Sequence, residues 1–199
     1  MADLITVADY KTAQGITGLQ QDARLASIVT SVSQLVKTYC NNAIIDYYKA
    51  YGLDEDFSIH YGEDFIQLSQ CPVTGIRSVY ERDNPSASFS TENELVANVD
   101  YYFDKNTDSI YRINSDGTPK SFKSGMGTVR VTYNAGYEET PADLKLAVID
   151  LITYYHKDEH KLRQTIAGAS IQNSASTSQR GNVGFPDHIK RVLDLYKNY

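Results

Sequence analysis

The stretch from Val129 to Tyr155, reading VRVTYNAGYEETPADLKLAVIDLITYY, constrains the fold more than any other part of the chain. Its first residues alternate between apolar and polar side chains, which is the period-two pattern of a half-buried strand. Gly136 then readily takes the positive φ of a tight turn, and Thr140 and Pro141 fit the cap and the first turn of a helix. Apolar residues recur every three or four positions after that: Leu144, Ala147, Val148, Leu151, Ile152 and Tyr155. We therefore predict a strand, a turn and an amphipathic helix that runs to about Arg163.

The same periodicity predicts two helices near the start of the chain. A short helix is expected over residues 5 to 13, and a longer one that Asp22 caps and that carries apolar residues as far as Tyr39. The apolar face of the longer helix consists of Leu25, Ile28, Val29, Val32, Val36 and Tyr39. Both helices therefore have one face to bury.

The middle of the chain is rich in strand signals. We predict strands over Phe57–Leu68 and Val73–Arg82, and a hairpin whose arms are Asp100–Asp104 and Ser109–Ile113. Helices at both ends and strands between them predict an α+β fold, in which a small helical bundle carries an inserted antiparallel β-rich region. The expected boundaries are residues 1–53, 54–133 and 134–199, forming one compact domain with an insertion.

Residues 164 to 184 form a polar segment rich in Ser, Gln, Asn, Gly and Ala. Its composition buries little apolar surface, so we expect a long loop that is disordered in an isolated subunit. Loops of this length usually serve an interaction or act as linkers, and both interpretations stay open here.

Composition bounds the function further. With 25 Asp and Glu against 19 Lys and Arg, the net charge of −6 disfavours a protein that grips nucleic acid through its phosphates. No apolar run approaches the roughly 20 residues that span a bilayer, and no signal-peptide pattern opens the chain, so we expect no membrane partner and synthesis in a cytoplasm. Cys40 and Cys71 lack metal or redox spacing and are expected to be buried thiols.

We find no signature of an enzyme. His156 and His160 share a helix-like spacing, but the Glu that follows the first His in the zinc-protease pattern is replaced by Lys157. Phosphate-binding loops and nucleophile elbows are absent from the sequence. We therefore expect no catalytic residue, no metal and no cofactor.

Four pieces of the chain, taken in order, resemble the head–tail connector proteins of tailed bacteriophages, also called adaptors or head-completion proteins. They are Val7–Lys11 with Gly15 and Ile16, the helix DARLASIVTSVSQLVKTYC, the stretch from Tyr133 to Val148, and Phe185–Leu193. The resemblance is loose between about Tyr80 and Gly127.

This resemblance implies a structural protein of the virion at the head–tail junction, made in the cytoplasm of a bacterial host. It implies a homo-oligomeric ring, a dodecamer, that docks under the portal protein and offers a surface to a tail, stopper or tail-terminator protein. Phage DNA passes through the lumen of such a ring, and the acidic balance of this chain suits passage without tight binding.

The resemblance also suggests where contacts lie. The terminal amphipathic helix is expected to face the portal, through Ile189, Arg191, Val192, Leu193, Tyr196 and Tyr199. The alternative is that this helix packs on the helices of its own subunit. The polar segment is expected to meet neighbouring subunits or the channel, through Gln164, Ile166, Ile171, Gln172, Arg180 and Val183.

A second function class stays open. The chain has 16 Tyr residues, and Tyr is enriched at protein–protein interfaces. In this alternative the β-rich insertion is a carbohydrate- or protein-binding module, with Tyr101, Tyr102 and Phe103 as its platform.

Overall fold

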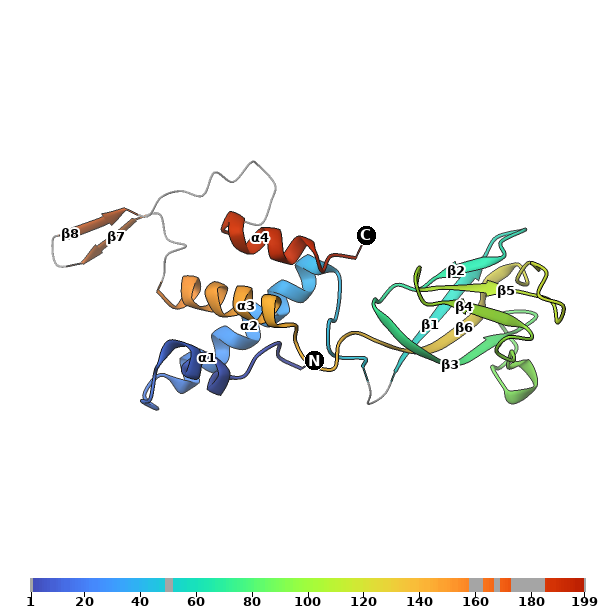
Figure 1. The fold of residues 1–199 in the computed structure, drawn as a ribbon, viewed down its shortest axis with the longest axis horizontal. Coiled ribbons are helices and arrows are strands. Elements are labelled where there is room, and N and C mark those ends of the chain that lie inside the picture. Colours follow the sequence, from blue (N-terminus) through green and yellow to red (C-terminus); the bar gives the residue numbers. More distant parts are fainter. Residues whose placement is uncertain (1, 49–51, 158–162, 167–168, 173–184, 199) are drawn as a thin grey trace. The chain divides into compact units, whose positions relative to one another are not determined.

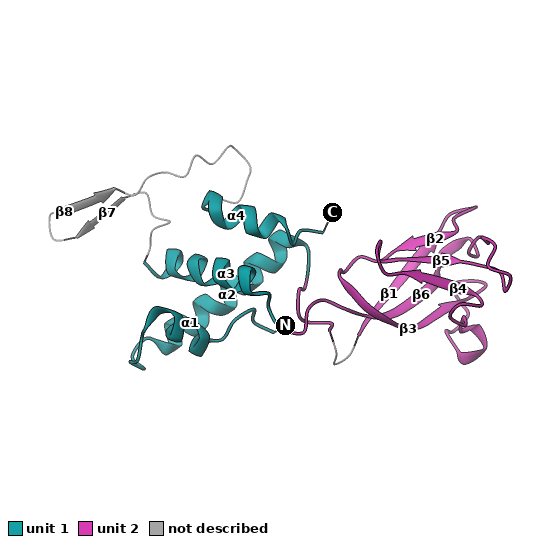
Figure 2. Ribbon diagram, in the orientation of Figure 1, with its two compact units in different colours: residues 1–42, 139–199 teal, residues 43–138 magenta. Residues whose placement is uncertain are grey.

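The computed structural model describes residues 2–48, 52–157, 163–166, 169–172 and 185–198 (Figure 1). The chain divides into two compact units, coloured separately in Figure 2. Residues 1–42 and 139–199 form the helical unit, and residues 43–138 form the β unit. The mixed α+β class is confirmed, while the divisions fall at 42/43 and 138/139 rather than at 53/54 and 133/134.

The helical unit contains α1 (Val7–Gln14), α2 (Asp22–Cys40), α3 (Ala142–His156) and α4 (Asp187–Asp194). Helix α2 contacts each of the other three helices, and α3 also contacts α4. The side chains buried between them are mostly aliphatic, as the periodicity predicts: Leu25, Val29, Val32, Val36, Leu144, Val148, Leu151, Ile152, Ile189 and Leu193.

The helix starts differ in detail from the predictions. Thr6 caps α1 in a reciprocal capping box, in which the Asp9 amide donates to the Thr6 hydroxyl and Asp9 accepts from the Thr6 amide. The hydrogen bond from the Thr6 amide lowers the pKa of Asp9. Asp22 does not cap α2, because the cap position is Gln21. Asp22 instead pairs with Lys11 at 2.8 Å and so links the first two helices.

Helix α3 is also shorter than predicted. Its cap position is Pro141, and the Thr140 hydroxyl donates instead to the Leu4 carbonyl. The helix ends at His156, close to the last apolar residue of the periodic face, Tyr155. Arg163 belongs to strand β7, so the predicted extension of the helix to about Arg163 is wrong.

The polar segment contains regular structure where it is described. Strands β7 (Arg163–Ile166) and β8 (Ala169–Gln172) pair antiparallel as a hairpin. The expectation of a continuous loop from residue 164 is therefore wrong for residues 164–166 and 169–172, which pair in this ladder.

The β unit contains two three-stranded antiparallel sheets (Figure 1). One has the order β1-β6-β3, from Leu53–Ile59, Gly125–Ala135 and Val73–Glu81. The other has the order β2-β5-β4, from Phe65–Gln67, Ser109–Arg112 and Tyr101–Asp104. A short 3₁₀ turn spans Thr91–Asn93. The predicted hairpin and the strand at Val73 are confirmed.

The predicted single strand over Phe57–Leu68 is wrong, since it is divided between the two sheets. Strand β1 ends at Ile59, and Gly62 has φ +88 in the turn before β2. A positive φ in this position breaks the extended run, and glycine tolerates it.

The two sheets share one hydrophobic cluster. Its members come from all six strands, from Leu68 just after β2 and from the loop at Phe122: Ile59, Ile66, Leu68, Val73, Val79, Tyr101, Ile110, Phe122, Val129, Val131, Tyr133 and Ala135. The alternation predicted for β6 is confirmed, because Val129, Val131 and Tyr133 are fully buried.

Candidate functional site

An apolar groove lies on the helical unit between α2 and α3. Its volume is about 380 Å³, and its lining residues are Ser27, Ile28, Ser31, Val32, Leu35 and Tyr155. Five of these share one side of α2 at intervals of three and four, whereas Tyr155 comes from the end of α3. This spacing is that of one face of a helix, so α2 forms most of the groove.

Helix α2, which supplies most of the groove, has a long run of residues without charged side chains. The twelve residues from Leu25 to Val36 include no Asp, Glu, Lys or Arg. Several of them, such as Ala26, Ser27 and Ser31, are nonetheless exposed. The solvent face of a surface helix is normally charged, and charge depletion is characteristic of interface cores. The uncharged run is visible in the sequence and could have indicated this surface.

Helix α4 is held firmly on its own subunit. Ile189 and Leu193 are buried, at 1% and 0% exposure. The Tyr39 hydroxyl donates to Asp194 at 2.6 Å, and the Tyr196 hydroxyl donates to Asp143 at 2.7 Å. This last hydrogen bond lowers the pKa of Asp143.

The described part of the terminal segment therefore divides into two sets. Ile189 and Leu193 face the subunit core, as in the alternative interpretation of this helix. Arg191 is exposed, and Val192 and Tyr196 are half-buried, so these three residues remain accessible. Tyr199 lies outside the described residues.

The residues expected in the polar segment are only partly described. Gln164 pairs with Ile171, Ile166 pairs with Ala169, and Gln172 pairs with Arg163 across the β7–β8 hairpin. Arg180 and Val183 lie outside the described residues.

The β unit carries an exposed row of three aromatic rings. Phe65 on β2, Tyr111 on β5 and Tyr102 on β4 are direct cross-strand partners. They are 50%, 36% and 51% exposed, and the Phe65 and Tyr111 rings stack with centroids 5.8 Å apart. We call these three residues the aromatic row.

This row replaces the platform expected at Tyr101, Tyr102 and Phe103. Successive residues of a strand point to opposite faces, so only Tyr102 of the three belongs to the exposed face. Tyr101 is 6% exposed and Phe103 packs against the buried cluster. The predicted hairpin register already places Tyr102 opposite Tyr111, so the sequence contained that part of the signal. Phe65 was missed because its strand was merged with β1.

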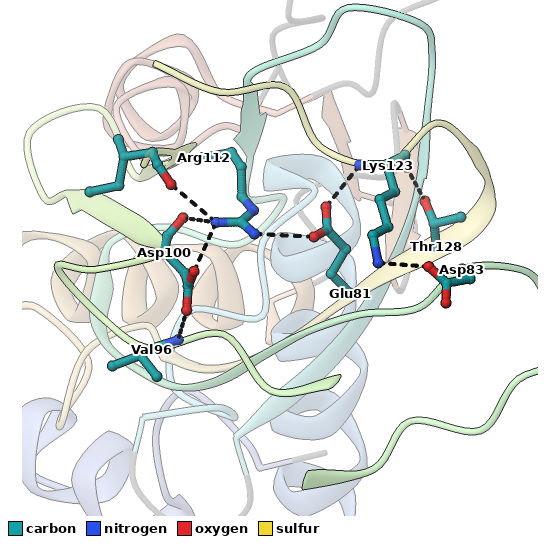
Figure 3. A network of polar contacts seen from close by, with 8 residues as sticks. Glu81, Asp83, Val96, Asp100, Arg112, Lys123 and Thr128 are labelled. Atoms are coloured by element: carbon teal, nitrogen blue, oxygen red, sulfur yellow. Dashed lines mark hydrogen bonds and ion pairs between the residues drawn. The ribbon is translucent and has the colours of Figure 1, made fainter. Parts of the chain in front are cut away.

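A buried polar network joins the two sheets of the β unit (Figure 3). The Arg112 guanidinium donates to Glu81 at 3.3 Å and to the carbonyl oxygens of Asp100 and Ile113. Glu81 in turn accepts from the Lys123 amide at 2.8 Å. Arg112 and Glu81 are each 5% exposed, and Arg112 Nε has no hydrogen-bond partner among the described residues. The network fixes β5, next to Tyr111, to β3 of the other sheet.

The cysteines and the histidine pair singled out in the sequence can be compared with the structure. Cys40 is buried, which raises its pKa to about 12, whereas Cys71 is only half-buried. Among the described residues no group of three or more His, Cys, Asp and Glu side chains is placed to hold a metal ion. His160 lies outside them. None of the helices in the described ranges is long and apolar enough to cross a membrane.

Comparison with known proteins gives a consistent result. A sequence model of the head completion protein family matches residues 3–199. The chain is 25% identical over 197 residues to the head completion protein of Escherichia phage T5, with 98% of each chain covered.

Solved structures with a similar fold come from phage-like particles. The neck of an empty gene transfer agent (GTA) particle, computed with C6 symmetry, contains a chain that matches with a TM-score of 0.60 and 17% identity, covering 98% of this chain and 90% of that one. The neck of the native particle, computed with C12 symmetry, contains one that matches with a TM-score of 0.57 and 14% identity, covering 100% and 94%.

Proposed function

Because the chain belongs to the head completion protein family, we propose that it is a structural protein of the head–tail junction of a virion. In this role, copies of the chain form a ring under the portal, conduct DNA and provide the docking surface for a tail or stopper protein. The family match over residues 3–199 carries the proposal. The likeness in fold to a chain from a C12-symmetric neck supports a ring of twelve.

The uncharged groove between α2 and α3 supports contacts between copies. A closed ring repeats one heterologous contact, so each copy needs two different complementary surfaces. An apolar groove with an uncharged margin loses little on leaving water, since few charges must be desolvated. We assign this groove to one side of the subunit contact. The β7–β8 hairpin is a second proposed contact with neighbours or the channel, because an isolated two-stranded hairpin is marginally stable without a packing partner.

The accessible side of α4 is the proposed portal contact. Arg191, Val192 and Tyr196 contribute directly, whereas Ile189 and Leu193 hold the helix in place through burial. Deleting residues 186–199 would expose the apolar surface that these two residues cover, so truncation is a poor test. Arg191→Glu is a better test of the portal contact, because Arg191 is exposed and its replacement leaves the core of the helical unit intact.

The direct experiment adds purified protein to portal-bearing heads that lack it, followed by cryo-electron microscopy of the neck. We expect a ring of twelve copies under the portal. Leu35→Glu, which puts a charge into the groove, should abolish the ring. Ala26→Glu adds the same charge to an exposed position of α2 that does not line the groove, and should leave the ring intact. Heads that bind no copy of the wild-type protein would refute the proposal.

The last part of the proposed function is that DNA passes through the ring without being bound tightly. Non-specific duplex binders reach a Kd of about 10⁻⁴ to 10⁻⁶ M through several phosphate contacts. We expect weaker binding than this at physiological salt for the isolated chain, given its net charge of −6. Micromolar binding with a steep salt dependence in a fluorescence titration would contradict a passive conduit.

A further inference from the structure

We propose that the aromatic row of the β unit is the docking face for a tail-side protein whose contacting surface is rich in Lys and Arg. The inference rests on the proposed function, because a ring under the portal has to present a second surface to the next protein. It assigns that role to Phe65, Tyr102 and Tyr111.

The aromatic row exposes three large aromatic side chains that the core of the sheet does not need. The opposite face of the same sheet buries Ile66, Ile110 and Tyr101, at 5%, 0% and 6% exposure. The sheet therefore has enough apolar residues for its own core without the three outer rings. Each outer ring nonetheless keeps a third or more of its surface in water. Contiguous exposed apolar groups rimmed by polar ones mark interaction sites, and Tyr is a common energetic anchor there.

The row is also held in a fixed position. Arg112, next to Tyr111 on β5, is anchored by Glu81 and by the carbonyl oxygens of Asp100 and Ile113 on the buried side (Figure 3). On the outer side, Phe65 stacks on Tyr111. Rings that are ordered before binding lose less conformational entropy on association, which favours a preformed docking face.

The polar groups beside the row favour a protein over a sugar. The next cross-strand set on this face is Gln67, Ser109 and Asp104. Gln67 donates to the Thr107 carbonyl and accepts from the Ser109 hydroxyl, at 2.9 and 2.8 Å. The Asp104 carboxylate accepts from the Asn106 amide and the Thr107 hydroxyl. A small polar ligand needs convergent donors and acceptors, and these groups already bind one another.

The charge of the β unit specifies the chemistry of the partner. Residues 43–138 contain 15 Asp and Glu against 8 Lys and Arg. Near the row, Glu63 and Asp64 directly precede Phe65, and Asp104 shares the outer face with Tyr102. Lysine and arginine side chains complement such carboxylates, and their cations also bind the faces of tyrosine rings. A basic partner surface therefore fits, whereas DNA and other acidic surfaces are repelled.

The experiment uses heads loaded with the protein and tails purified from particles that carry it. We compare the wild type with Tyr102→Ala/Tyr111→Ala and, as control, with Met126→Ala, which removes a 71% exposed apolar side chain elsewhere in the β unit. All three proteins should bind heads equally. The double variant should join tails at least tenfold more slowly, the control should match the wild type, and raising the salt should slow joining by the wild type.

A second arm identifies what the face touches. A photoreactive phenylalanine at position 102 is cross-linked to free tails, without heads, and the linked peptides are identified by mass spectrometry. Cross-links to a Lys- and Arg-rich segment of a tail-side protein support the inference. Cross-links only to another copy of this chain, or normal tail joining by the double variant, would overturn it. If the wild type fails to bind heads, the proposed function fails, while this arm still tests the face by itself.

Discussion

The helical unit and the β unit differ most in how they carry charge. Residues 1–42 and 139–199 contain 10 Asp and Glu and 11 Lys and Arg, whereas residues 43–138 contain 15 and 8. The acidic surplus of the whole chain therefore comes from the β unit alone. The net charge of −6 for the whole chain therefore describes neither the nearly neutral helical unit nor the more acidic β unit.

The two units also differ in their cores. The helices bury mostly aliphatic side chains together with Lys37, whose ammonium donates to the Ala2 carbonyl, while the β unit buries the Arg112–Glu81 ion pair between its sheets. The first kind of core depends on packing, and the second also depends on complete pairing of buried charges. The proposed contacts differ in the same way. The apolar contact between copies should be insensitive to salt, whereas the contact of the acidic β unit with a basic partner should weaken as the salt concentration rises.

The largest expected effect tests the ion pair. Arg112→Met leaves Glu81 buried without its cation, and breaking such a pair typically costs about 3–5 kcal/mol. The free energy of unfolding of the β unit, measured by urea denaturation, should fall by that amount. The double variant Arg112→Met/Glu81→Leu should be more stable than Arg112→Met, because no unpaired charge remains. Equal stability of the two variants would show that the pair has no special place in this core.

The second prediction concerns the helical core. Leu193→Ala removes a fully buried side chain from α4 and should cost about 2–5 kcal/mol through lost burial and the cavity left behind. Leu195→Ala is the matched control, since Leu195 is 77% exposed and its loss should change stability by under about 0.5 kcal/mol. Calorimetry should show the change in the helical unit alone. An equal loss in the β unit would mean that the two units unfold as one.

The third prediction concerns the turn after β6. Gly136 has φ +92, and an added Cβ would lie 2.2 Å from the Ile44 carbonyl oxygen. Gly136→Ala should therefore cost more than the roughly 1 kcal/mol of a simple positive-φ substitution. Gly15→Ala provides the comparison, because Gly15 has φ +66 with nothing within 4 Å of its Cβ position. Similar losses of unfolding free energy in the two variants would remove the steric argument.

Sequence periodicity predicted much of the fold because its strongest signals come from burial. The buried face of α2 and the buried alternation of Val129, Val131 and Tyr133 followed directly from apolar spacing. Caps were less predictable, since Thr140 has a suitable side chain but binds the distant Leu4 carbonyl. That choice depends on tertiary contacts that a local pattern does not contain.

The candidate surfaces were predictable only in part for the same reason. An amphipathic pattern finds an apolar face, but not whether its own subunit covers that face. Ile189 and Leu193 satisfy the pattern and are buried in the helical unit, whereas Leu35 remains at an open groove. The aromatic row needed the correct strand bounds, because its members come from three strands that are distant in the sequence.

The smallest expected effect tests whether surface charge stabilises the acidic unit at all. Asp56 on β1 accepts two hydrogen bonds from Arg130 on β6, at 2.6 and 2.8 Å, and these bonds lower the pKa of Asp56 below its usual 3.8. The pair therefore stabilises the β unit above about that pH, and the contribution disappears as the pH falls through the lowered pKa. Both side chains are more than one-third exposed, so solvent screening limits the effect to about 0.2–1 kcal/mol. Asp56→Asn should lower the free energy of unfolding by this amount at pH 7 and low salt, and the difference from the wild type should shrink as the pH is lowered below 4. A difference that stays constant with pH and salt would mean that Asp56 acts through packing rather than through its charge.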